Sequence, residues 1–270
     1  MDLHAYVVTR MPATFATIRR ALCELPKDFE PRTLLDVGSG PGTASWAAAA
    51  FFPSLTDITF LDKNSAFLAM AKSLTKESAN SSLRSANAVL SDVLELGDAV
   101  AGELAIAAYT LAELPMAKVS SAAKAMWNAC TNTLVIIEPG TPSGFERIRA
   151  ARTLLINSGA HILAPCPHAH QCPIIEPDWC HFKVRLMRSR EHLHAKSARV
   201  PFEDEKFSYL IASRYLTPPH SARILGPPIK SKPAIEFKLC TATGLLRQSV
   251  ATRDEAEYKR VRKLEWGDTF

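Results

Sequence analysis

Short apolar or β-branched runs alternate with segments of helical periodicity through the first 160 residues. The runs that predict buried strands are residues 33–37, 58–61, 86–90, 104–109 and 133–137. Segments with apolar residues at helical spacing predict helices over residues 13–25, 43–52, 65–75, 117–129 and 145–157. Strands that alternate with helices of about ten to fifteen residues are typical of a doubly wound parallel sheet. The pattern therefore predicts an α/β fold.

The pattern changes near residue 160. Residues 164–182 hold four prolines, three cysteines and three histidines and fit no periodic element, so they predict a loop that needs a further group to hold it. Two strand-like runs follow, at residues 182–187 and 207–212, and we expect them to complete the sheet. The remainder predicts a small β appendage with a basic terminal helix, with strands near 234–240 and 245–251 and the helix over 254–264.

These changes divide the chain into three parts. We predict an N-terminal helical segment over residues 1–30, a main domain over 31–215 that includes the loop at 164–182, and a basic C-terminal appendage over 216–270. Apolar residues make up 47% of the chain and charged residues 22%, which excludes a disordered or collagenous protein. The longest apolar run, residues 46–52, is too short to span a membrane, and no secretory signal is visible. We therefore expect a cytoplasmic protein without a membrane partner.

The strongest motif is DVGSGPG at residues 36–42, between the first predicted strand and an Ala-rich helix. Three glycines at alternate positions let the backbone turn tightly and approach a ligand, and the next helix presents free N–H groups. The spacing G-x-G-x-G differs from the dinucleotide fingerprint and resembles motif I of class I S-adenosylmethionine-dependent methyltransferases, whose loop wraps the methionine part of the cofactor. The residues that we expect at the cofactor are Asp36, Gly38, Ser39, Gly40 and Gly42.

Two carboxylates after the next strands fit the same cofactor. Asp62 ends the second predicted strand, where a carboxylate can accept hydrogen bonds from both ribose hydroxyls. Asp92 follows the third strand, where methyltransferases of this class often contact the adenine amino group. Either residue alone would more often be a helix cap or a turn residue. Because all three signals occur in order at strand ends, we predict a Rossmann-like class I methyltransferase fold that binds S-adenosylmethionine.

Catalytic residues for methyl transfer are not evident. Many amino methyltransferases have an Asn/Asp-Pro-Pro-Tyr motif after the fourth strand, but residues 108–114 are AYTLAEL. This segment also lacks a cysteine that could be the nucleophile of a cytosine C5 methyltransferase. Glu113 and Glu138 are the only carboxylates near the expected active face, and each could instead cap a helix or pair with a base. The sequence therefore predicts a cofactor site and leaves methyl transfer open.

Four cysteines form a second constellation: Cys166, Cys172, Cys180 and Cys240. Disulfides are rare in the cytosol and a proline-rich loop offers little apolar core, so these thiols favour a metal site. Four thiolates can hold Zn²⁺ or an iron–sulfur cluster. The absence of paired C-x(2–4)-C turns weakly favours the larger cluster, whereas His168, His170 and His181 keep a mixed zinc site open. We interpret Cys23 and Cys130 as plain core residues.

Charge is distributed unevenly along the chain. Residues 1–182 hold 14 Lys and Arg against 17 Asp and Glu, a net −3, whereas residues 183–270 hold 18 against 10, a net +8. A basic third on a mildly acidic body indicates a surface for a polyanion such as nucleic acid, although an ordinary solvated surface has the same composition. The candidate RNA-binding residues are Arg185, Arg188, Arg190, Lys259, Arg260, Arg262 and Lys263. We expect the folded metal loop to bring both groups onto one appendage.

Longer stretches of the chain are similar to a known family. They are residues 138–142 (EPGTP), 164–168 (APCPH), 179–182 (WCHF) and 203–209 (EDEKFSY). With them, the chain from about residue 10 to its end resembles the ribosomal small-subunit-associated, methyltransferase-like family of bacteria and mitochondria. The resemblance implies that the four cysteines ligate a [4Fe–4S] cluster rather than zinc. It also implies a role in small-subunit assembly and translation.

A ribosome-assembly factor is therefore our leading interpretation. It would bind S-adenosylmethionine, hold a [4Fe–4S] cluster and dock on small-subunit rRNA or its assembly intermediates, and it would be monomeric off the ribosome. Two alternatives stay open: an active rRNA methyltransferase of unknown target, and a non-enzymatic, metal-stabilised RNA-binding module. Four protein thiolates leave no open iron for chemistry, so we interpret the cluster as structural.

Overall fold

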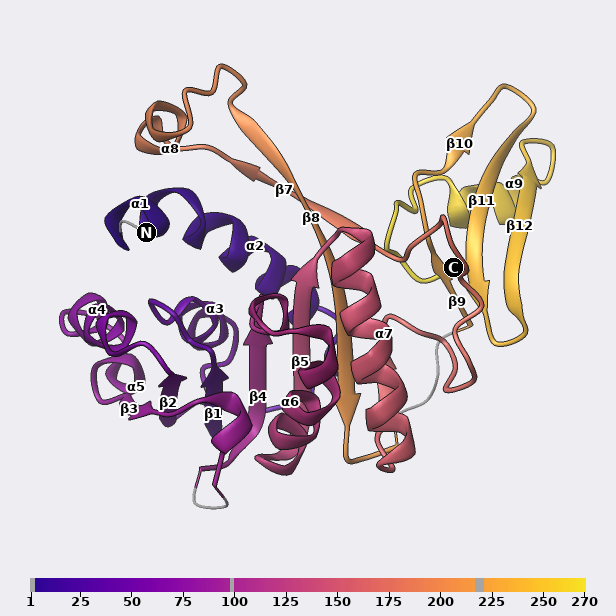
Figure 1. The fold of residues 1–270 in the computed structure, drawn as a ribbon. Coiled ribbons are helices and arrows are strands. Elements are labelled where there is room, and N and C mark those ends of the chain that lie inside the picture. The colour runs from indigo at the N-terminus through magenta and orange to yellow at the C-terminus, as the bar shows by residue number, and fades with distance from the viewer. Residues whose placement is uncertain (1–2, 98–99, 217–220) are drawn as a thin grey trace.

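A central eight-stranded sheet organises the larger part of the protein (Figure 1). The computed structural model describes residues 3–97, 100–216 and 221–270. The strands follow the order β3-β2-β1-β4-β5-β8-β6, and β7 also pairs with β8. Their bounds are β1 Thr33–Val37, β2 Asp57–Asp62, β3 Asn87–Leu90, β4 Gly102–Ala108, β5 Cys130–Pro139, β6 His161–Ala164, β7 Phe182–Met187 and β8 Phe202–Ser213. All five strands predicted in the first 140 residues belong to this sheet.

The direction of the strands sets the position of any ligand site. Strands β1 to β5 are parallel, and β8 runs antiparallel between β5 and β6. Val37 pairs with Leu61 and with Ala107, so the carboxyl ends of β1, β2 and β4 meet at one edge. Open α/β sheets bind ligands outside this edge, where the strand order reverses. The predicted doubly wound α/β fold is confirmed.

Helices cover both faces of the sheet. Helices α2 to α5 pack on one face, and α6 and α7 pack on the other. Their bounds are α2 Met11–Leu22, α3 Thr43–Phe51, α4 Ser65–Thr75, α5 Ser81–Arg84, α6 Met116–Asn128 and α7 Pro142–Asn157. Neighbouring residues of one strand therefore pack into different cores. Leu34 of β1 belongs to the first core, with α2 to α5, and Leu35 belongs to the second core, with α6 and α7. This burial on both faces explains why the strands are continuous apolar runs in the sequence.

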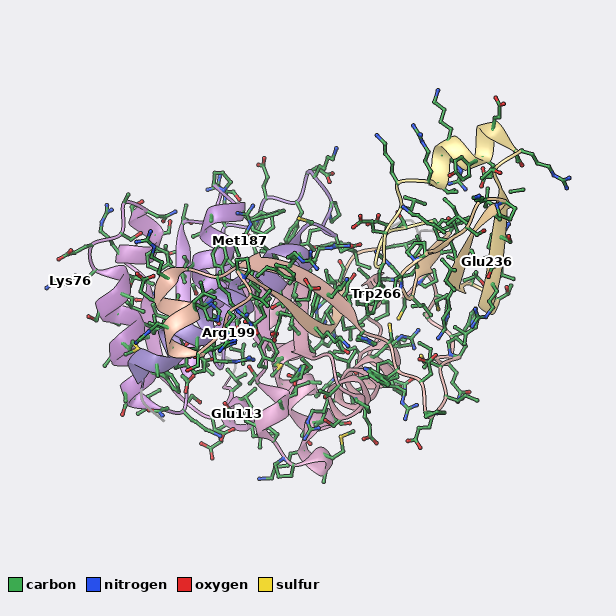
Figure 2. The ribbon with its side chains drawn as sticks, turned by 90° about the horizontal axis from the view of Figure 1, so that it is seen from above. Lys76, Glu113, Met187, Arg199, Glu236 and Trp266 are labelled. Atoms are coloured by element: carbon green, nitrogen blue, oxygen red, sulfur yellow. The ribbon has the colours of Figure 1, made fainter. Side chains whose placement is uncertain are left out.

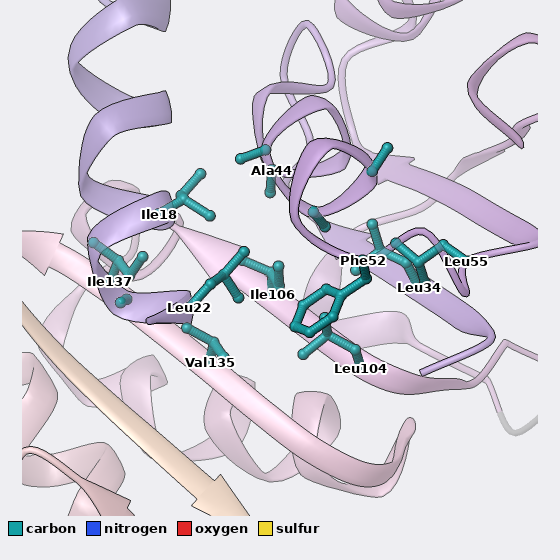
Figure 3. Close-up of a cluster of buried hydrophobic side chains, with 14 of the residues drawn as sticks. Ile18, Leu22, Leu34, Ala44, Phe52, Leu55, Leu104, Ile106, Val135 and Ile137 are labelled. Atoms are coloured by element: carbon teal, nitrogen blue, oxygen red, sulfur yellow. The ribbon is translucent and has the colours of Figure 1, made fainter. Parts of the chain in front are cut away.

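The first core joins the N-terminal helices to the sheet (Figure 3). Ile18 and Leu22 of α2 pack with Ile106 of β4 and Ile137 of β5. Burying such a side chain contributes roughly 1.5–3 kcal/mol, so α2 is held firmly. The N-terminal part that we predict at residues 1–30 thus shares the core of the main domain. Helix α1, Leu3–Thr9, is too short for its periodicity to be read from the sequence.

Strands β7 and β8 extend beyond the sheet as an arm, residues 182–207. Strand β8 has 12 residues, of which 207–213 pair with β5 and 202–207 pair with β7. Helix α8, Arg190–Ala195, lies at the tip of the arm, which reaches over α1 (Figure 1). The strand predicted at 207–212 begins earlier than expected because β7 supplies hydrogen-bond partners beyond the edge of β5.

A second sheet and one helix form the C-terminal appendage, residues 222–270. The strand order is β10-β11-β12, and β9 also pairs with β11. The bounds are β9 Ala222–Ile224, β10 Ile229–Lys230, β11 Ala234–Thr241, β12 Gly244–Ala251 and α9 Glu255–Val261. A small core of its own contains Ile224, Phe237 and Val261. No helix in the described part of the chain is long and apolar enough to cross a membrane.

Candidate functional site

A cleft opens at the carboxyl ends of β1, β2 and β4. Four predicted cofactor residues line it: Gly38, Gly40, Asp62 and Asp92. Tyr6 of α1 and Tyr109 at the end of β4 line it as well, and neither is singled out by the sequence as a cofactor residue. The cleft lies where α/β sheets of this kind bind ligands. We refer to it as the cofactor cleft.

The glycine loop has left-handed backbone at all three glycines. The φ angles are 64° at Gly38, 52° at Gly40 and 83° at Gly42, a region that favours glycine. A Cβ on Gly38 would lie 2.6 Å from Thr110 Oγ1, and one on Gly42 would lie 3.0 Å from the Phe60 ring. A Cβ on Gly40 would meet no protein atom within 4 Å. Packing therefore requires Gly38 and Gly42, whereas Gly40 faces open space in the cleft.

Asp36, Ser39 and Gly42 support the loop from behind the cleft. Asp36 is buried, and its Oδ2 accepts hydrogen bonds from Ser45 N at 2.9 Å and Ser45 Oγ at 2.8 Å. Burial raises the pKa of Asp36 to about 7, although the bonds from Ser45 oppose this shift. Ser39 N donates to Leu61 O at 3.0 Å, and Gly42 is the N-cap of α3. Direct contact of these three residues with a cofactor stays a prediction.

Asp62 and Asp92 have structural roles and also line the cleft. Asp62 Oδ2 accepts a hydrogen bond from Gly40 N at 2.8 Å, and Oδ1 accepts one from Asn64 N at 2.8 Å. Each carboxylate oxygen has a further lone pair, so Asp62 can still accept from a ligand hydroxyl. Asp92 Oδ1 accepts from Leu94 N at 2.9 Å and so caps the short 3-10 helix Val93–Glu95. Asp92 is thus a helix cap, as the alternative interpretation of the sequence expects, and it also lines the cleft.

Tyr109 is held in a backbone conformation that is rare for a residue with a side chain. Its φ is 62°, and its amide donates to Ile137 O at 2.7 Å. The hydroxyl donates to Glu205 Oε1 at 3.2 Å, and the Arg10 guanidinium carbon lies 5.7 Å from the ring centroid. Burial raises the pKa of Tyr109, and the nearby Glu205 carboxylate adds to the shift. Such strain is often found at functional sites, and only the packing around the residue reveals it.

Glu138 lies beneath the cleft, whereas Glu113 lines it. Glu138 Oε1 accepts a hydrogen bond from Leu111 N at 2.8 Å, and Oε2 is buried without a hydrogen-bond partner among the described residues. Burial raises the pKa of Glu138 to about 8, although the Leu111 amide opposes the shift. Glu138 therefore positions the segment 110–114. Of these two glutamates, Glu113 is therefore the one that can face a bound ligand.

The four predicted metal ligands line one cavity between the loop, α7 and β11. They are Cys166, Cys172, Cys180 and Cys240. Burial raises the pKa of Cys180 well above its ordinary value, and the other three thiols raise it further. Burial and neighbouring thiols also raise the pKa of Cys240 to about 12. Because the thiols influence one another, they form one group, which we call the cysteine cavity.

The four thiols lie around the cavity, and the histidines of the loop lie near them. Within residues 3–97, 100–216 and 221–270, no three Cys, His, Asp or Glu side chains are placed to hold a single metal ion. His168 Nε2 lies 3.7 Å from Cys240 Sγ, and His170 stacks on His168 with the ring centroids 5.8 Å apart. His181 stacks on Trp179 instead, at 5.0 Å.

The other two cysteines differ from each other. Cys130 is buried as predicted, at the start of β5, and burial raises its pKa to about 11. Cys23 is exposed, so the prediction that it is a core residue is wrong. Helix α2 ends at Leu22, one residue before Cys23, and the side chain therefore leaves the apolar face of the helix.

Arg223 of β9 joins three distant segments beside the cysteine cavity. Its Nη2 lies 2.8 Å from Glu24 Oε2, just after α2. Its Nε donates to Pro165 O at 3.0 Å, and its Nη1 donates to Gly267 O at 2.6 Å. This buried ion pair fastens the C-terminal appendage and the loop to the main domain. Nothing in the local sequence around residue 223 indicates this role, because its partners are remote along the chain.

Arg152 of α7 also lines the cysteine cavity. It is buried, and its Nη2 donates to His168 O at 2.7 Å. The sequence contains a local signal for this position. Arg152 lies four residues after Ile148 and three before Leu155, both buried, so a charge occupies the apolar stripe of a helix. A charge in that position indicates a buried partner.

The two groups of candidate RNA-binding residues lie far apart (Figures 1 and 2). Those at 185–190 are on the arm over α1, whereas those at 259–263 are on or directly after α9, at the opposite end of the molecule. The prediction that both groups share one appendage is wrong. Strand β7 pairs with the free half of β8, and this pairing leads the chain away from the cysteine cavity.

Ion pairs also distinguish the two groups. Arg185 donates to both oxygens of Asp204, at 2.6 and 2.8 Å, and Arg188 lies 3.2 Å from Glu203. On α9, Arg260 pairs with Glu257 at 2.6 Å. Among the candidate residues on or directly after α9, three exposed cations have no carboxylate within ion-pair distance in the described part of the chain: Lys259, Arg262 and Lys263. The unpaired positive charge of the candidate set, apart from exposed Arg190, is therefore concentrated near α9.

Comparison with known proteins agrees with the resemblance seen in the sequence. The family described as mitochondrial small ribosomal subunit Rsm22 matches residues 1–270. The human mitochondrial ribosome assembly protein METTL17 is 28% identical over 97% of this chain and 61% of its own length. The Schizosaccharomyces pombe mitochondrial Rsm22-cox11 tandem protein 2 is 25% identical over 98% of this chain and 42% of its own. This chain thus spans less than two thirds of the length of either relative.

Solved structures of methyltransferases also match. Magnesium protoporphyrin IX methyltransferase from Synechocystis PCC 6803, with bound S-adenosylmethionine, has a TM-score of 0.49 and 14% identity, over 76% of this chain and 79% of that one. An RNA methyltransferase homologue, PH1948 from Pyrococcus horikoshii, has a TM-score of 0.48 and 12% identity, over 75% of this chain and 82% of that one.

Proposed function

Because the chain belongs to the Rsm22 family, we propose that it is a methyltransferase-like factor of small-ribosomal-subunit assembly. In this proposal it binds S-adenosylmethionine, holds a [4Fe–4S] cluster and docks on small-subunit rRNA. The observation that carries the proposal is the cofactor cleft, in which open space over Gly40 lies beside the carboxylate of Asp62.

The cleft suits a nucleoside with a charged amino-acid part. Asp62 can accept from ribose hydroxyls, and Asp92 at the end of β3 can accept from an adenine amino group. Gly40 lets the backbone approach the methionine part, and Glu113 adds a carboxylate for its cationic centres. When bound, S-adenosylmethionine supplies an electrophilic methyl group. The residues of this chain bind and orient it.

The cysteine cavity fits the implied cluster. Four thiols from two remote segments line one cavity. Four cysteines are the usual ligand set of a [4Fe–4S] cluster, and they leave no iron open for substrate. Two buried arginines beside the cavity, Arg152 and Arg223, suit the negative charge of a metal–thiolate group. The cluster would fasten the C-terminal appendage, and zinc is the alternative ion.

Docking on rRNA is supported by the exposed charge at α9. Lys259, Arg262 and Lys263 can neutralise phosphates without first breaking an ion pair. Aromatic side chains for base stacking are sparse near them, so we expect recognition of the backbone and shape of folded rRNA. Binding of this kind weakens steeply as salt rises, because it releases counterions.

Purified protein tests the proposal directly. Calorimetry should show binding of S-adenosylmethionine, anaerobic preparations should contain about four irons per chain, and the protein should co-sediment with small-subunit particles. Absence of S-adenosylmethionine binding would contradict the proposal and favour the RNA-binding module. Stoichiometric zinc without iron would replace the cluster by a zinc site.

Methyl transfer is a separate question, because residues 108–114 lack a recognised catalytic motif. Incubation of immature small-subunit particles with radiolabelled S-adenosylmethionine distinguishes the two functions. Label in rRNA would show an active rRNA methyltransferase. Cofactor binding and co-sedimentation without transferred label would show an assembly factor that uses the cofactor as a ligand.

A further inference from the structure

Arg152 is a buried cation whose charge has no protein counter-ion. Only 4% of the residue is exposed, and no carboxylate in the described part of the chain lies within ion-pair distance of it. Its Nη2 donates to the carbonyl of His168, but its Nε–H is buried without an acceptor. The nearby Arg223 differs, because Glu24 offsets its charge at 2.8 Å.

This arrangement is costly unless an anion lies beside it. Removing an unpaired charge from water is unfavourable, and a buried N–H without an acceptor adds to that cost. The cavity that Arg152 lines holds the four thiols, two further arginines, Arg149 and Arg223, and apolar side chains such as Ile174, and no carboxylate of the described residues lines it. Arg152 and Cys166 line this cavity together, so the guanidinium lies on the same space as the thiols.

We propose that Arg152 is the charge-balancing and positioning residue of the cysteine cavity, with its Nε–H donating to a sulfur of an anionic metal–thiolate group. The inference rests on the proposed function, because the group is the cluster held by the four cysteines. Hydrogen bonds to cluster sulfurs and nearby positive charge favour the more negative, reduced state. Arg152 therefore sets both the retention of the cluster and its reduction potential.

A pair of substitutions at residue 152 tests this role. Arg152→Met removes the charge and the donors at similar length, whereas Arg152→Lys keeps the charge and removes the Nε–H. Arg247→Met, on the exposed face of β12, is the control for loss of one positive charge. We expect Arg152→Met to lower iron affinity about 10- to 100-fold in competition with a chelator, and to shift the reduction potential to more negative values. Arg152→Lys should retain more of both properties.

Stability of the metal-free protein separates this role from a purely structural one. If Arg152 only braces the loop through His168, Arg152→Met should lower the melting temperature of the metal-free protein. If its charge is balanced only by the bound metal–thiolate group, the charge is unpaired in the metal-free protein. The same variant should then melt no lower than the metal-free parent, because an unpaired buried charge has been removed. The two hypotheses therefore predict different melting temperatures for the metal-free variant.

The possible outcomes are distinct. The inference would be overturned if the parent protein holds iron and Arg152→Met leaves the iron affinity and the reduction potential unchanged. The proposed function would then stay intact. Parent protein that holds no metal would overturn both. If Arg152→Met does not fold, Arg152→Lys decides, because a potential equal to that of the parent would exclude the Nε–H bond.

Discussion

The cofactor cleft and the cysteine cavity are built in opposite ways. Most of the cleft comes from residues 38–114, at the ends of neighbouring strands, and its main carboxylate Asp62 already accepts two backbone hydrogen bonds. The cysteine cavity combines the loop after β6 with β11, 60 or more residues away, and it contains a buried cation without a counter-ion. The cleft is therefore organised without a ligand, whereas we expect the cavity to depend on the group that we propose it binds.

The difference lies in which forces hold each site. Strand pairing and helix capping fix the cleft, and these are local and repeated interactions. The ion pair of Arg223 with Glu24 holds the cavity, and in the proposed function a group bound by the four thiols holds it as well. We expect loss of one site to leave the other nearly unchanged, and the following predictions test that independence from the largest effect to the smallest.

Removal of one cluster ligand should have the largest effect. Cys240→Ser should abolish iron binding and make the C-terminal appendage sensitive to limited proteolysis, because β11 loses its link to the loop. Calorimetry should show nearly unchanged affinity for S-adenosylmethionine. Cys23→Ser is the matched control, since Cys23 is exposed and does not line the cavity. Loss of cofactor binding in Cys240→Ser would break the proposed independence of the two sites.

Closing the space over Gly40 should have the converse effect. Gly40→Val should abolish binding of S-adenosylmethionine by placing a branched side chain in the cleft, while iron content stays at the parent level. Gly159→Val is the control, because Gly159 also has a left-handed φ, of 81°, and open space at its Cβ, yet lies outside the cleft. Equal loss of binding in both variants would attribute the effect to backbone strain alone.

Charge reversal near α9 should release the protein from its partner. Arg260, Arg262 and Lys263 changed together to Glu should prevent co-sedimentation with small-subunit particles at moderate salt, because phosphate contacts are replaced by repulsion. The control is reversal of three exposed lysines on the main domain: Lys76, Lys118 and Lys124. Persistent co-sedimentation of the first variant would exclude α9 as the docking surface, and release of both would indicate only a net-charge effect.

Loss of the ribose acceptor should give a moderate effect. Asp62→Ala should weaken S-adenosylmethionine binding by about one to two decades, because a hydrogen bond to a charged acceptor contributes roughly 1.5–3 kcal/mol. Asp57→Ala, at the exposed start of the same strand, should bind as the parent does. Calorimetric affinities that do not differ between the two variants would remove Asp62 from the cofactor site.

The smallest effect concerns the buried carboxyl of Glu138. Its pKa is about 8 in the folded protein, well above the ordinary value of 4.5, so between these values the folded state keeps a proton that the unfolded state loses. Stability should therefore fall as pH rises through this range, by at most about 1.4 kcal/mol per pH unit. Glu138→Gln should flatten this slope in urea denaturation, and Glu146→Gln, exposed on α7, should not. An unchanged slope in Glu138→Gln would show that Glu138 is ionised in the folded state.

The sequence predicts the sheet and the cleft well because both arise from local patterns. Burial on two faces makes strands such as β1 continuous apolar runs, and the glycine loop occupies consecutive positions between a strand and a helix. The arm is a different case. That β7 pairs with half of β8 depends on two segments meeting beyond the sheet, which no local period shows. The expected convergence of the two basic groups is wrong for this reason.

For the cysteine cavity, the sequence predicts the four thiols and not their surroundings. The thiols are conspicuous by residue type, whereas Glu24 and Arg223 become partners only when both ends of the chain are folded. Arg152 has a local signal, a charge on the apolar stripe of α7, but that signal does not say what the charge faces. The left-handed Tyr109 has no signal at all, because packing rather than residue type imposes it.

Glu24 and Arg223 are 199 positions apart, so their ion pair can form only late in synthesis, after most of the chain has been translated. Residues 33–139 include β1 to β5 and can form the cleft while the rest of the chain is still being translated. The thiols up to Cys180 emerge before Cys240 does, and at about 5–20 residues per second the delay is roughly 3–12 s. During that interval three thiols are uncovered and open to oxidation. We therefore expect the nascent chain to depend on a reducing environment until Cys240 has emerged.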